Sequence, residues 1–204
     1  MHKNPVIIFE GVETSGKSTN IQNVSNFLKK IKRKYIKIRE PGGSKNSEKI
    51  RKLILNKRST LNKKTDLLLM LASRSENIDK IIKKNYKKKI ILIDRFTDST
   101  IAYQHYGMGL NIKLINILNN YIVEKFKPNL TFLSLVNKKN MKKRLKLRIN
   151  TNKYDNFNYA FYNKVQKGFL KLSKRNKNYI ILDSNNNNSN EIKKILINNI
   201  KKII

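Results

Sequence analysis

Apolar residues along this chain follow two alternating patterns. Short runs that are apolar throughout, or that alternate apolar with polar residues, have the length and composition of strands. They occupy residues 6–9, 35–39, 89–95, 129–136 and 178–183. Between and after them, apolar residues recur every three or four positions, the spacing of a helix with one buried face. These segments predict helices over about 17–33, 47–56, 66–84, 99–106, 112–126, 157–174 and 191–204.

Strands that alternate with helices predict an α/β fold, in which helices flank both faces of a five-stranded parallel sheet in three layers with right-handed crossovers. The 204 residues suit one domain with a sizeable core, preceded by a short leader over residues 1–5. Ligands of such sheets bind at the carboxyl ends of the strands. We therefore expect residues 11–18, 39–41 and 94–95 and the end of the fourth strand to lie on one rim.

The first strand leads into the sequence GVETSGKS, residues 11–18, which fits the pattern G-x-x-x-x-G-K-[ST]. Gly11 and Gly16 allow backbone conformations in which several N–H groups face a phosphate. The helix that begins near Lys17 adds the positive end of its dipole, and Lys17 can reach the terminal phosphates. Ser18 offers a hydroxyl to Mg²⁺. This strand–loop–helix context predicts a nucleotide phosphate site, the P-loop.

Three charged residues near this rim each allow two interpretations. Asp94 stands where nucleotide-hydrolysing proteins carry an acid linked to magnesium, but it could instead cap the next helix and pair with Arg95. A carboxylate at Glu13 is costly beside a phosphate, so we expect it to face a hydroxyl or magnesium; the alternative is an outward-facing acid. Arg74 lies in the mostly apolar segment LLLMLASRSEN and is either solvated or emerges in the cleft.

The charge balance is extreme, with 46 Lys and Arg against 13 Asp and Glu and a formal net charge of +33. Such a balance suggests a polyanionic partner. However, the chain has 37 Lys and only 9 Arg, a poor supply of bidentate phosphate or guanine contacts, and it is rich in Asn and Ile, which share AT-rich codons. We favour compositional drift and expect no specific nucleic-acid partner, although weak nonspecific binding at low salt could follow.

Composition also excludes several classes of protein. Without cysteine there is no disulfide framework and no thiolate zinc site, and His2 and His105 are too isolated to suggest a metal site. Apolar runs are too short for a membrane span or a signal peptide, so we expect a cytoplasmic soluble protein. The basic stretch after the fourth strand, about residues 138–156, is either a solvated face or a short basic lid over transferring phosphates.

Taken together, six segments resemble the bacterial thymidylate kinases, a family of P-loop nucleoside monophosphate kinases. The resemblance covers nearly the whole chain, and its most specific parts are the second and fourth segments. The segments are FEGVETSGKST (9–19), IREPGGS (38–44), LMLASR (69–74), DRFTDSTIAYQHYGMGL (94–110), FKPNLTFLSL (126–135) and VQKGFLKL (165–172).

This resemblance implies roles for individual residues. ATP would be bound by Gly11, Val12, Glu13, Thr14, Ser15, Gly16, Lys17, Ser18 and Thr19, and Mg²⁺ by Ser18 and Asp94. dTMP would be bound by Glu13, Arg39, Met70, Arg74, Arg95, Thr100, Tyr103 and Gln104. Glu13 would take the 3′-hydroxyl, Arg95 the monophosphate, and Tyr103 would disfavour ribose at C2′. The catalytic group would comprise Lys17, Asp94, Arg95 and Arg148.

Two departures from the family pattern affect these expectations. Met70 stands where the family usually has an aromatic residue that stacks on thymine, so base affinity should be weaker. The lid has Asn152, Lys153, Tyr154 and Asp155 where the family has aspartate, arginine, isoleucine and glutamate. The phosphate loop has Thr14 where some relatives place an arginine. A lid cation is therefore needed, and we expect Arg148, then Lys153 and Arg144.

The expected reaction is transfer of the γ-phosphoryl group of ATP, with Mg²⁺, to dTMP, giving dTDP for dTTP synthesis. The resemblance also implies a single kinase domain over residues 1–204 and a homodimer. A P-loop kinase for a different nucleoside monophosphate is the nearest alternative. Two further alternatives belong to other classes. One is a nucleic-acid-binding P-loop protein, which the small number of Arg residues argues against. The other is a decayed relative with only a structural role, which the intact phosphate loop and the Asp94–Arg95 pair argue against.

Overall fold

The computed structural model describes residues 4–149 and 151–204. Positions 1–3 of the expected leader, including His2, and position 150 of the expected lid lie outside the described residues. Within the described ranges, every helix is too short or too polar to cross a membrane.

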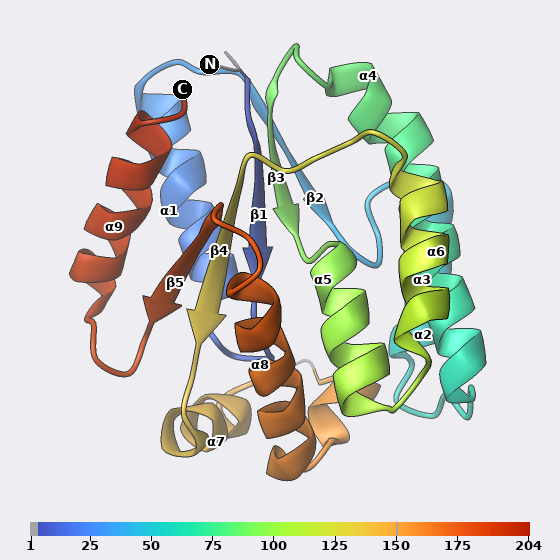
Figure 1. Cartoon of the computed structure of the whole chain (residues 1–204). Coiled ribbons are helices and arrows are strands. Elements are labelled where there is room, and N and C mark those ends of the chain that lie inside the picture. Colours follow the sequence, from blue (N-terminus) through green and yellow to red (C-terminus); the bar gives the residue numbers. More distant parts are fainter. Residues whose placement is uncertain (1–3, 150) are drawn as a thin grey trace.

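Five parallel strands form one sheet in the order β2-β3-β1-β4-β5, which confirms the predicted α/β fold (Figure 1). The strands are β1 (Val6–Glu10), β2 (Tyr35–Arg39), β3 (Ile90–Asp94), β4 (Leu130–Leu135) and β5 (Tyr179–Asp183). β1 is central and pairs with β3 and β4, so that Ile7 lies opposite both Leu92 and Leu130. The strand that carries the phosphate loop is therefore held on both sides.

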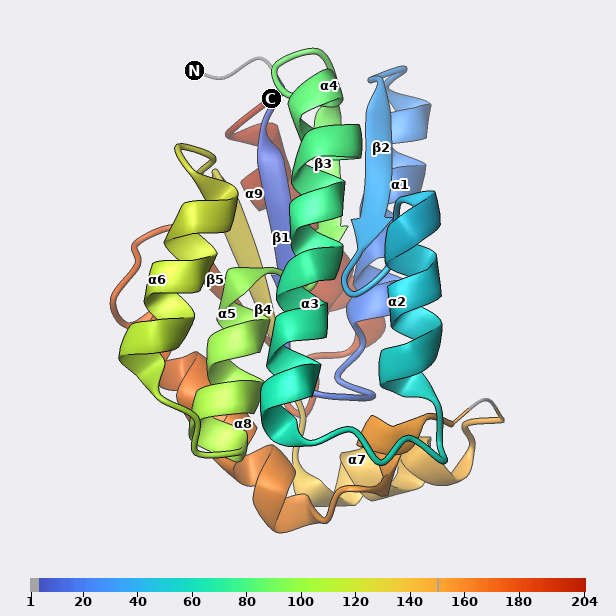
Figure 2. The same cartoon turned by 90° about the vertical axis from the view of Figure 1, so that its right-hand side faces the viewer.

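Helices cover both faces of the sheet. α1 (Lys17–Lys30) and α9 (Ser189–Lys201) lie on one face, as Figure 1 shows. The other face carries the remaining long helices, which Figure 2 shows from outside. They are α2 (Lys45–Leu55), α3 (Lys63–Asn77) with the π-helix η1 (Ile78–Ile82) and α4 (Lys83–Asn85), α5 (Thr97–Thr100) with the π-helix η2 (Ile101–Gly107), α6 (Ile112–Val123) and α8 (Tyr159–Ser173).

Successive residues of β1 point into different cores. Ile7 and Phe9 pack with residues of α1 and α9, whereas Val6 and Ile8 pack with residues of η1 on the opposite face. A strand that is buried on both faces has no polar side, and this is why β1 and β3 are apolar almost throughout. Because β1 is buried on both faces, the point at which the loop after Glu10 leaves the sheet is also fixed.

The structure refines three sequence expectations. The helix predicted from Asp66 begins at Lys63, after the N-cap Asn62, and widens into η1 at Ile78. The helix predicted from Ser99 begins at Thr97 and continues as η2. The basic stretch after β4 forms α7 (Lys138–Lys146), capped by Asn137 and anchored by the buried side chain of Met141, and the 3₁₀ turn η3 (Lys153–Asn156) follows.

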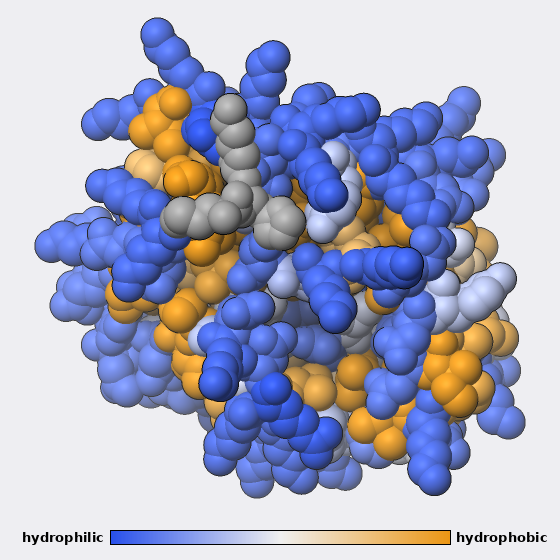
Figure 3. Space-filling view, turned by 45° about the horizontal axis from the view of Figure 1, so that its top comes forward, coloured by the Kyte–Doolittle hydropathy of each residue, from blue (hydrophilic) through white to orange (hydrophobic). Residues whose placement is uncertain are grey.

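Hydrophilic side chains cover most of the molecular face at the amino ends of the strands, with small apolar areas between them (Figure 3).

Candidate active site

The carboxyl ends of the strands surround a cavity of about 720 Å³. It brings together almost all the residues that the sequence predicted for the site. They are Glu13, Thr14, Ser15, Gly16, Lys17, Ser18, Thr19, Arg39, Met70, Arg74, Asp94, Arg95, Thr100, Tyr103, Gln104 and Arg148. The exceptions are Gly11 and Val12, which are buried at the start of the loop, and the alternative lid cation Lys153.

The two glycines of the phosphate loop meet different demands. Gly11 has a φ of 138°, and a Cβ there would lie 2.4 Å from the carbonyl oxygen of Ser134. Gly16 is the N-cap of α1 and has a φ of 98°. Side-chain-bearing residues would be strained at both positions. The loop thus passes close over β4 and turns directly into α1, whose amino end faces the cavity.

Lys17 projects from the first turn of α1 into the loop. Its ammonium group donates hydrogen bonds to the carbonyl oxygens of Gly11 and Val12, each at 2.9 Å. Burial, together with the nearby positive charge of Arg95, lowers the pKa of Lys17 to about 8. The amine is therefore placed where an anionic ligand would restore its full charge.

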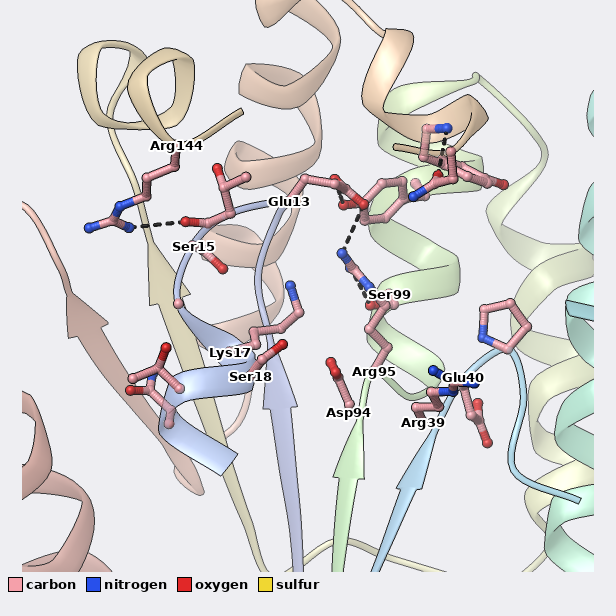
Figure 4. Close-up of a pocket in the computed structure, with 18 of the residues that line it drawn as sticks. Glu13, Ser15, Lys17, Ser18, Arg39, Glu40, Asp94, Arg95, Ser99 and Arg144 are labelled. Atoms are coloured by element: carbon pink, nitrogen blue, oxygen red, sulfur yellow. Dashed lines mark hydrogen bonds and ion pairs between the residues drawn. The ribbon is translucent and has the colours of Figure 1, made fainter. Parts of the chain in front are cut away.

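Ser18 and Asp94 supply oxygen atoms beside Lys17 (Figure 4). The interpretation of Asp94 as a helix cap is wrong, because α5 has Phe96 as its N-cap and no side-chain capping bond. The Oδ1 atom of Asp94 is buried and has no hydrogen-bond partner among the described residues. A hydroxyl and an unsatisfied carboxylate oxygen are donors of the kind that Mg²⁺ takes alongside phosphates, so the residues fit this ion.

Glu13, Arg95 and Tyr103 form a second cluster beside Lys17. Arg95 donates from Nη2 to Glu13 Oε1 at 2.9 Å, and the Tyr103 hydroxyl donates to Glu13 Oε2 at 2.5 Å. The guanidinium also lies over the Tyr103 ring, 5.0 Å from its centroid. Glu13 is only 9% exposed, so the interpretation as an outward-facing acid is wrong. Burial raises the pKa of Tyr103 and keeps its hydroxyl a neutral donor.

Arg74 is held in a buried network at the far end of the cavity. It donates from Nε to Glu40 at 2.7 Å, from Nη1 to Asn119 at 2.6 Å and from Nη2 to the Phe96 carbonyl at 2.9 Å. Arg74 is only 2% exposed, so the interpretation that its side chain is solvated is wrong. Nη1 and Nη2 each carry one more N–H group besides the one that makes these hydrogen bonds. Glu40, which sequence reasoning treated only as part of a turn, neutralises this charge.

Polar atoms with no partner lie near Arg74. The Gln104 amide is fully buried, and neither its nitrogen nor its oxygen has a partner among the described residues. The same holds for the hydroxyl of Thr100. A donor, an acceptor and a hydroxyl that are buried but unsatisfied suit the edge of a polar ring. Met70 also lines this end.

Two further arginines line the cavity between these groups. Arg39 is paired with Glu48 at 2.9 Å, and its side chain is 56% exposed. Arg51, which the sequence analysis missed, donates to the Pro41 carbonyl at 2.5 Å. Arg51 precedes the buried Ile54 by three positions on α2, so an arginine on an apolar helix face was the available signal.

The three candidate lid cations differ in their partners. Arg148 lines the cavity and pairs with Asp155, whereas Lys153 is bound to the buried Asp66 at 2.6 Å. Arg144 donates to the Thr14 carbonyl at 3.0 Å and so touches the phosphate loop (Figure 4). These partners make Arg144 and Arg148, rather than Lys153, the lid cations that face the cavity.

Comparisons with known proteins agree with this geometry. The family model described as thymidylate kinase matches residues 9–195. A thymidylate kinase of Thermosipho africanus is 37% identical over 194 residues, which are 93% of this chain and 96% of that protein. One from Ehrlichia ruminantium is 37% identical over 203 residues and covers 96% of both chains.

A solved structure agrees as well. The crystal structure of thymidylate kinase from Ehrlichia chaffeensis superimposes with a TM-score of 0.78 at 30% identity, covering 97% of this chain and 98% of that one. Both the family match and the curated relatives extend over most of the chain. The chain therefore belongs to the thymidylate kinase family.

Proposed function

We propose that this enzyme transfers the γ-phosphoryl group of ATP to dTMP and gives dTDP, a step toward dTTP. The observation that carries the proposal is one cavity in which two sets of groups suited to phosphates adjoin each other. The phosphate loop and Lys17 form the donor end. Arg95, which shares the Gly11 carbonyl with Lys17, forms the adjoining acceptor end with the unsatisfied groups of Thr100 and Gln104. Phosphoryl transfer needs both reactants in line and shielded from water.

At the donor end, the loop from Gly11 to Thr19 would hold the phosphates of ATP with its backbone N–H groups. Lys17 would exchange its two carbonyl partners for phosphate oxygens. Ser18 and Asp94 are the residues that would hold Mg²⁺, which when bound would neutralise charge on the phosphates. Arg144 and Arg148 would approach the donor from the lid.

At the acceptor end, Arg95 would bind the phosphate of dTMP, with Arg39 and Arg51 nearby. Glu13, held by Arg95 and Tyr103, would accept a hydrogen bond from the 3′-hydroxyl of the sugar. Tyr103 would pack against C2′. Arg74, Thr100 and Gln104 would pair with the edge of the base, and Met70 would lie against its face.

This proposal treats residues 1–204 as one nucleoside monophosphate kinase domain in the cytoplasm, with a lid over about residues 138–156. It also includes a homodimer. Figure 2 shows α2, α3 and α6 side by side on one face, and each of these helices exposes large apolar side chains. They are Leu53 on α2, Leu68 on α3, and Leu114, Ile117 and Tyr121 on α6. Large apolar side chains that are exposed on neighbouring helices favour a subunit interface there.

The test is a coupled assay of ADP release with ATP, Mg²⁺ and, separately, dTMP, dUMP, UMP and CMP. We expect the highest kcat/KM with dTMP, and no turnover without Mg²⁺. Another preferred acceptor would replace dTMP in the proposal with a different nucleoside monophosphate, a reading that the relatives do not favour. Absence of turnover with all four would overturn the kinase assignment.

A further inference from the structure

Glu10 is an acidic side chain that the proposed reaction does not use. It is the last residue of β1, directly before the phosphate loop, and it is fully buried. A buried carboxylate is costly unless several donors satisfy it. Its burial raises its pKa to about 7, although hydrogen bonds from Ser99 and Phe96 act in the other direction. Its position therefore calls for an explanation beyond packing.

The Glu10 carboxylate binds the first turn of α5. Oε1 accepts hydrogen bonds from the backbone N–H groups of Phe96 at 2.8 Å and Ser99 at 3.3 Å. Oε2 accepts from the Ser99 hydroxyl at 2.5 Å. Phe96, the N-cap of α5, makes no capping bond with its own side chain, so a side chain from β1 takes over that task.

The residue just before this turn is Arg95. It has a φ of 68°, a left-handed conformation that residues with side chains rarely adopt. Its backbone N–H donates to the Phe9 carbonyl at 3.0 Å, and its Nη1 donates to the Gly11 carbonyl at 2.9 Å and to Ser99 Oγ at 3.4 Å. Arg95 is thus held by both neighbours of Glu10 and by the hydroxyl that Glu10 binds.

We propose that Glu10 is a positioning residue for Arg95: it fixes the turn between β3 and α5 and orients Ser99, so that the guanidinium faces the phosphate of the acceptor. This inference rests on the proposed function, in which Arg95 binds the dTMP phosphate. Arg95 touches the substrate, and Glu10 acts only through Arg95 and Ser99. Of the groups proposed to recognise the sugar and base, Glu13 and Tyr103 contact Arg95, and Arg74 binds the Phe96 carbonyl, but each also has a partner other than Arg95 and the turn that Glu10 holds.

A comparison of dTMP with thymidine isolates this role, because thymidine lacks the phosphate. Dissociation constants of both ligands are measured calorimetrically for the wild type, Glu10→Gln and Ser99→Ala. We expect Glu10→Gln to weaken dTMP binding by about tenfold and Ser99→Ala by about threefold. Thymidine affinity should stay within about twofold. Asp79→Asn, which removes an exposed carboxylate far from the cavity, is the matched control and should change neither constant.

Two outcomes overturn the role. Equal losses for dTMP and thymidine in both variants would show that Glu10 supports the whole cavity rather than Arg95. An unchanged dTMP affinity in both variants would show that the turn holds without it. In an Arg95→Met background, Glu10→Gln should cause no further loss of dTMP affinity, and an additional tenfold loss would also contradict the proposal. If the wild type binds dTMP no more tightly than thymidine, the result contradicts the proposed phosphate-binding role of Arg95 itself, and so is distinguishable from a failure of the role of Glu10.

Discussion

Lys17 illustrates a conflict between function and stability in a single residue. Its pKa is lowered because burial disfavours the ammonium group, so this charge destabilises the folded protein when no anion is bound. Replacing Lys17 with Met should therefore reduce kcat by about a hundredfold or more, since a positioned cation is lost. The melting temperature should stay the same or rise.

Steady-state kinetics and thermal unfolding in the absence of nucleotide check this expectation. Lys29→Met, at the exposed end of α1, is the matched control and should leave both quantities unchanged. Near wild-type turnover of Lys17→Met would remove Lys17 from the donor site.

Glu10 provides a prediction for stability that is independent of its proposed role in the site. Its pKa is raised in the folded protein from 4.5 to about 7, so protonation favours folding. The stabilising contribution is fully present below pH 4.5 and is lost as the pH rises through about 7. The shift corresponds to something on the order of 3 kcal/mol. Glu10→Gln should therefore gain stability relative to the wild type as the pH rises from 5 to 8.

Denaturant unfolding at several pH values measures this difference in the free energy of unfolding. Burial also raises the pKa values of Glu40 and Asp98, but their contributions cancel because both proteins contain them. A difference that stays constant from pH 5 to 8 would mean that Glu10 titrates near its ordinary value.

At the residue level, prediction was possible where the chemistry is local in sequence. The spacing of Gly11, Gly16 and Lys17 is enough to identify the loop. Partners far apart in sequence gave no such signal: Glu10 and Ser99 are separated by 89 positions, and Arg74 and Glu40 by 34. Whether Arg74 is solvated or buried depends on its partner, and only the packed fold brings that partner close.

At the scale of elements, the two arginines of the proposed lid differ in what they touch. Arg144 touches the phosphate loop from α7, and Arg148 follows α7 and lines the cavity. Arg148→Ala should lower kcat by about tenfold or more with little change in KM for ATP, because its interaction would form mainly in the transition state. Arg144→Ala should mainly raise KM for ATP. The two variants serve as controls for each other in initial-rate kinetics.

A reversed pattern, with KM affected by Arg148 and kcat by Arg144, would exchange the two assignments. Lys153→Met gives a further comparison. Because Lys153 is bound to Asp66 on α3, its loss should act through the position of η3 and not through the donor phosphates. We therefore expect no large change in KM for ATP.

The elements themselves were predictable to different degrees. Strands of the buried parallel sheet are short and apolar, and apolar residues in the helices recur with a clear period. The existence and the type of most elements therefore followed from the pattern. The change to π-helical geometry at Ile78 and at Ile101 left no signal, because the apolar spacing of one wide turn resembles that of an α-helix. The helix α7 was hidden by its many lysines, which leave only Met141 and Leu145 as apolar residues.

For the whole molecule, the apolar face of α2, α3 and α6 leads to a prediction about assembly. Ile117, on α6, is 64% exposed. If this face joins two subunits, Ile117→Lys should bury an unpaired charge in the interface and shift the mass from a dimer to a monomer of 24.0 kDa. Sedimentation equilibrium measures the change.

Ile31→Lys is the matched control, since Ile31 follows α1 on the opposite face of the sheet and should leave the mass unaltered. A wild-type protein that sediments as a monomer at all concentrations would contradict the homodimer. A dimer that persists in Ile117→Lys would move the interface to another face.

The buried pair of Arg74 and Glu40 has a consequence for anyone who wishes to change the substrate range of this enzyme. Arg74 is bound at the same time to the EPGG turn, to α6 through Asn119 and to the backbone at Phe96. Exchanging it alone would strand a carboxylate in the interior, at about 3–5 kcal/mol. Libraries that vary position 74 by itself should therefore be dominated by unfolded clones, whereas libraries that vary positions 40, 74 and 119 jointly leave room for new base preferences.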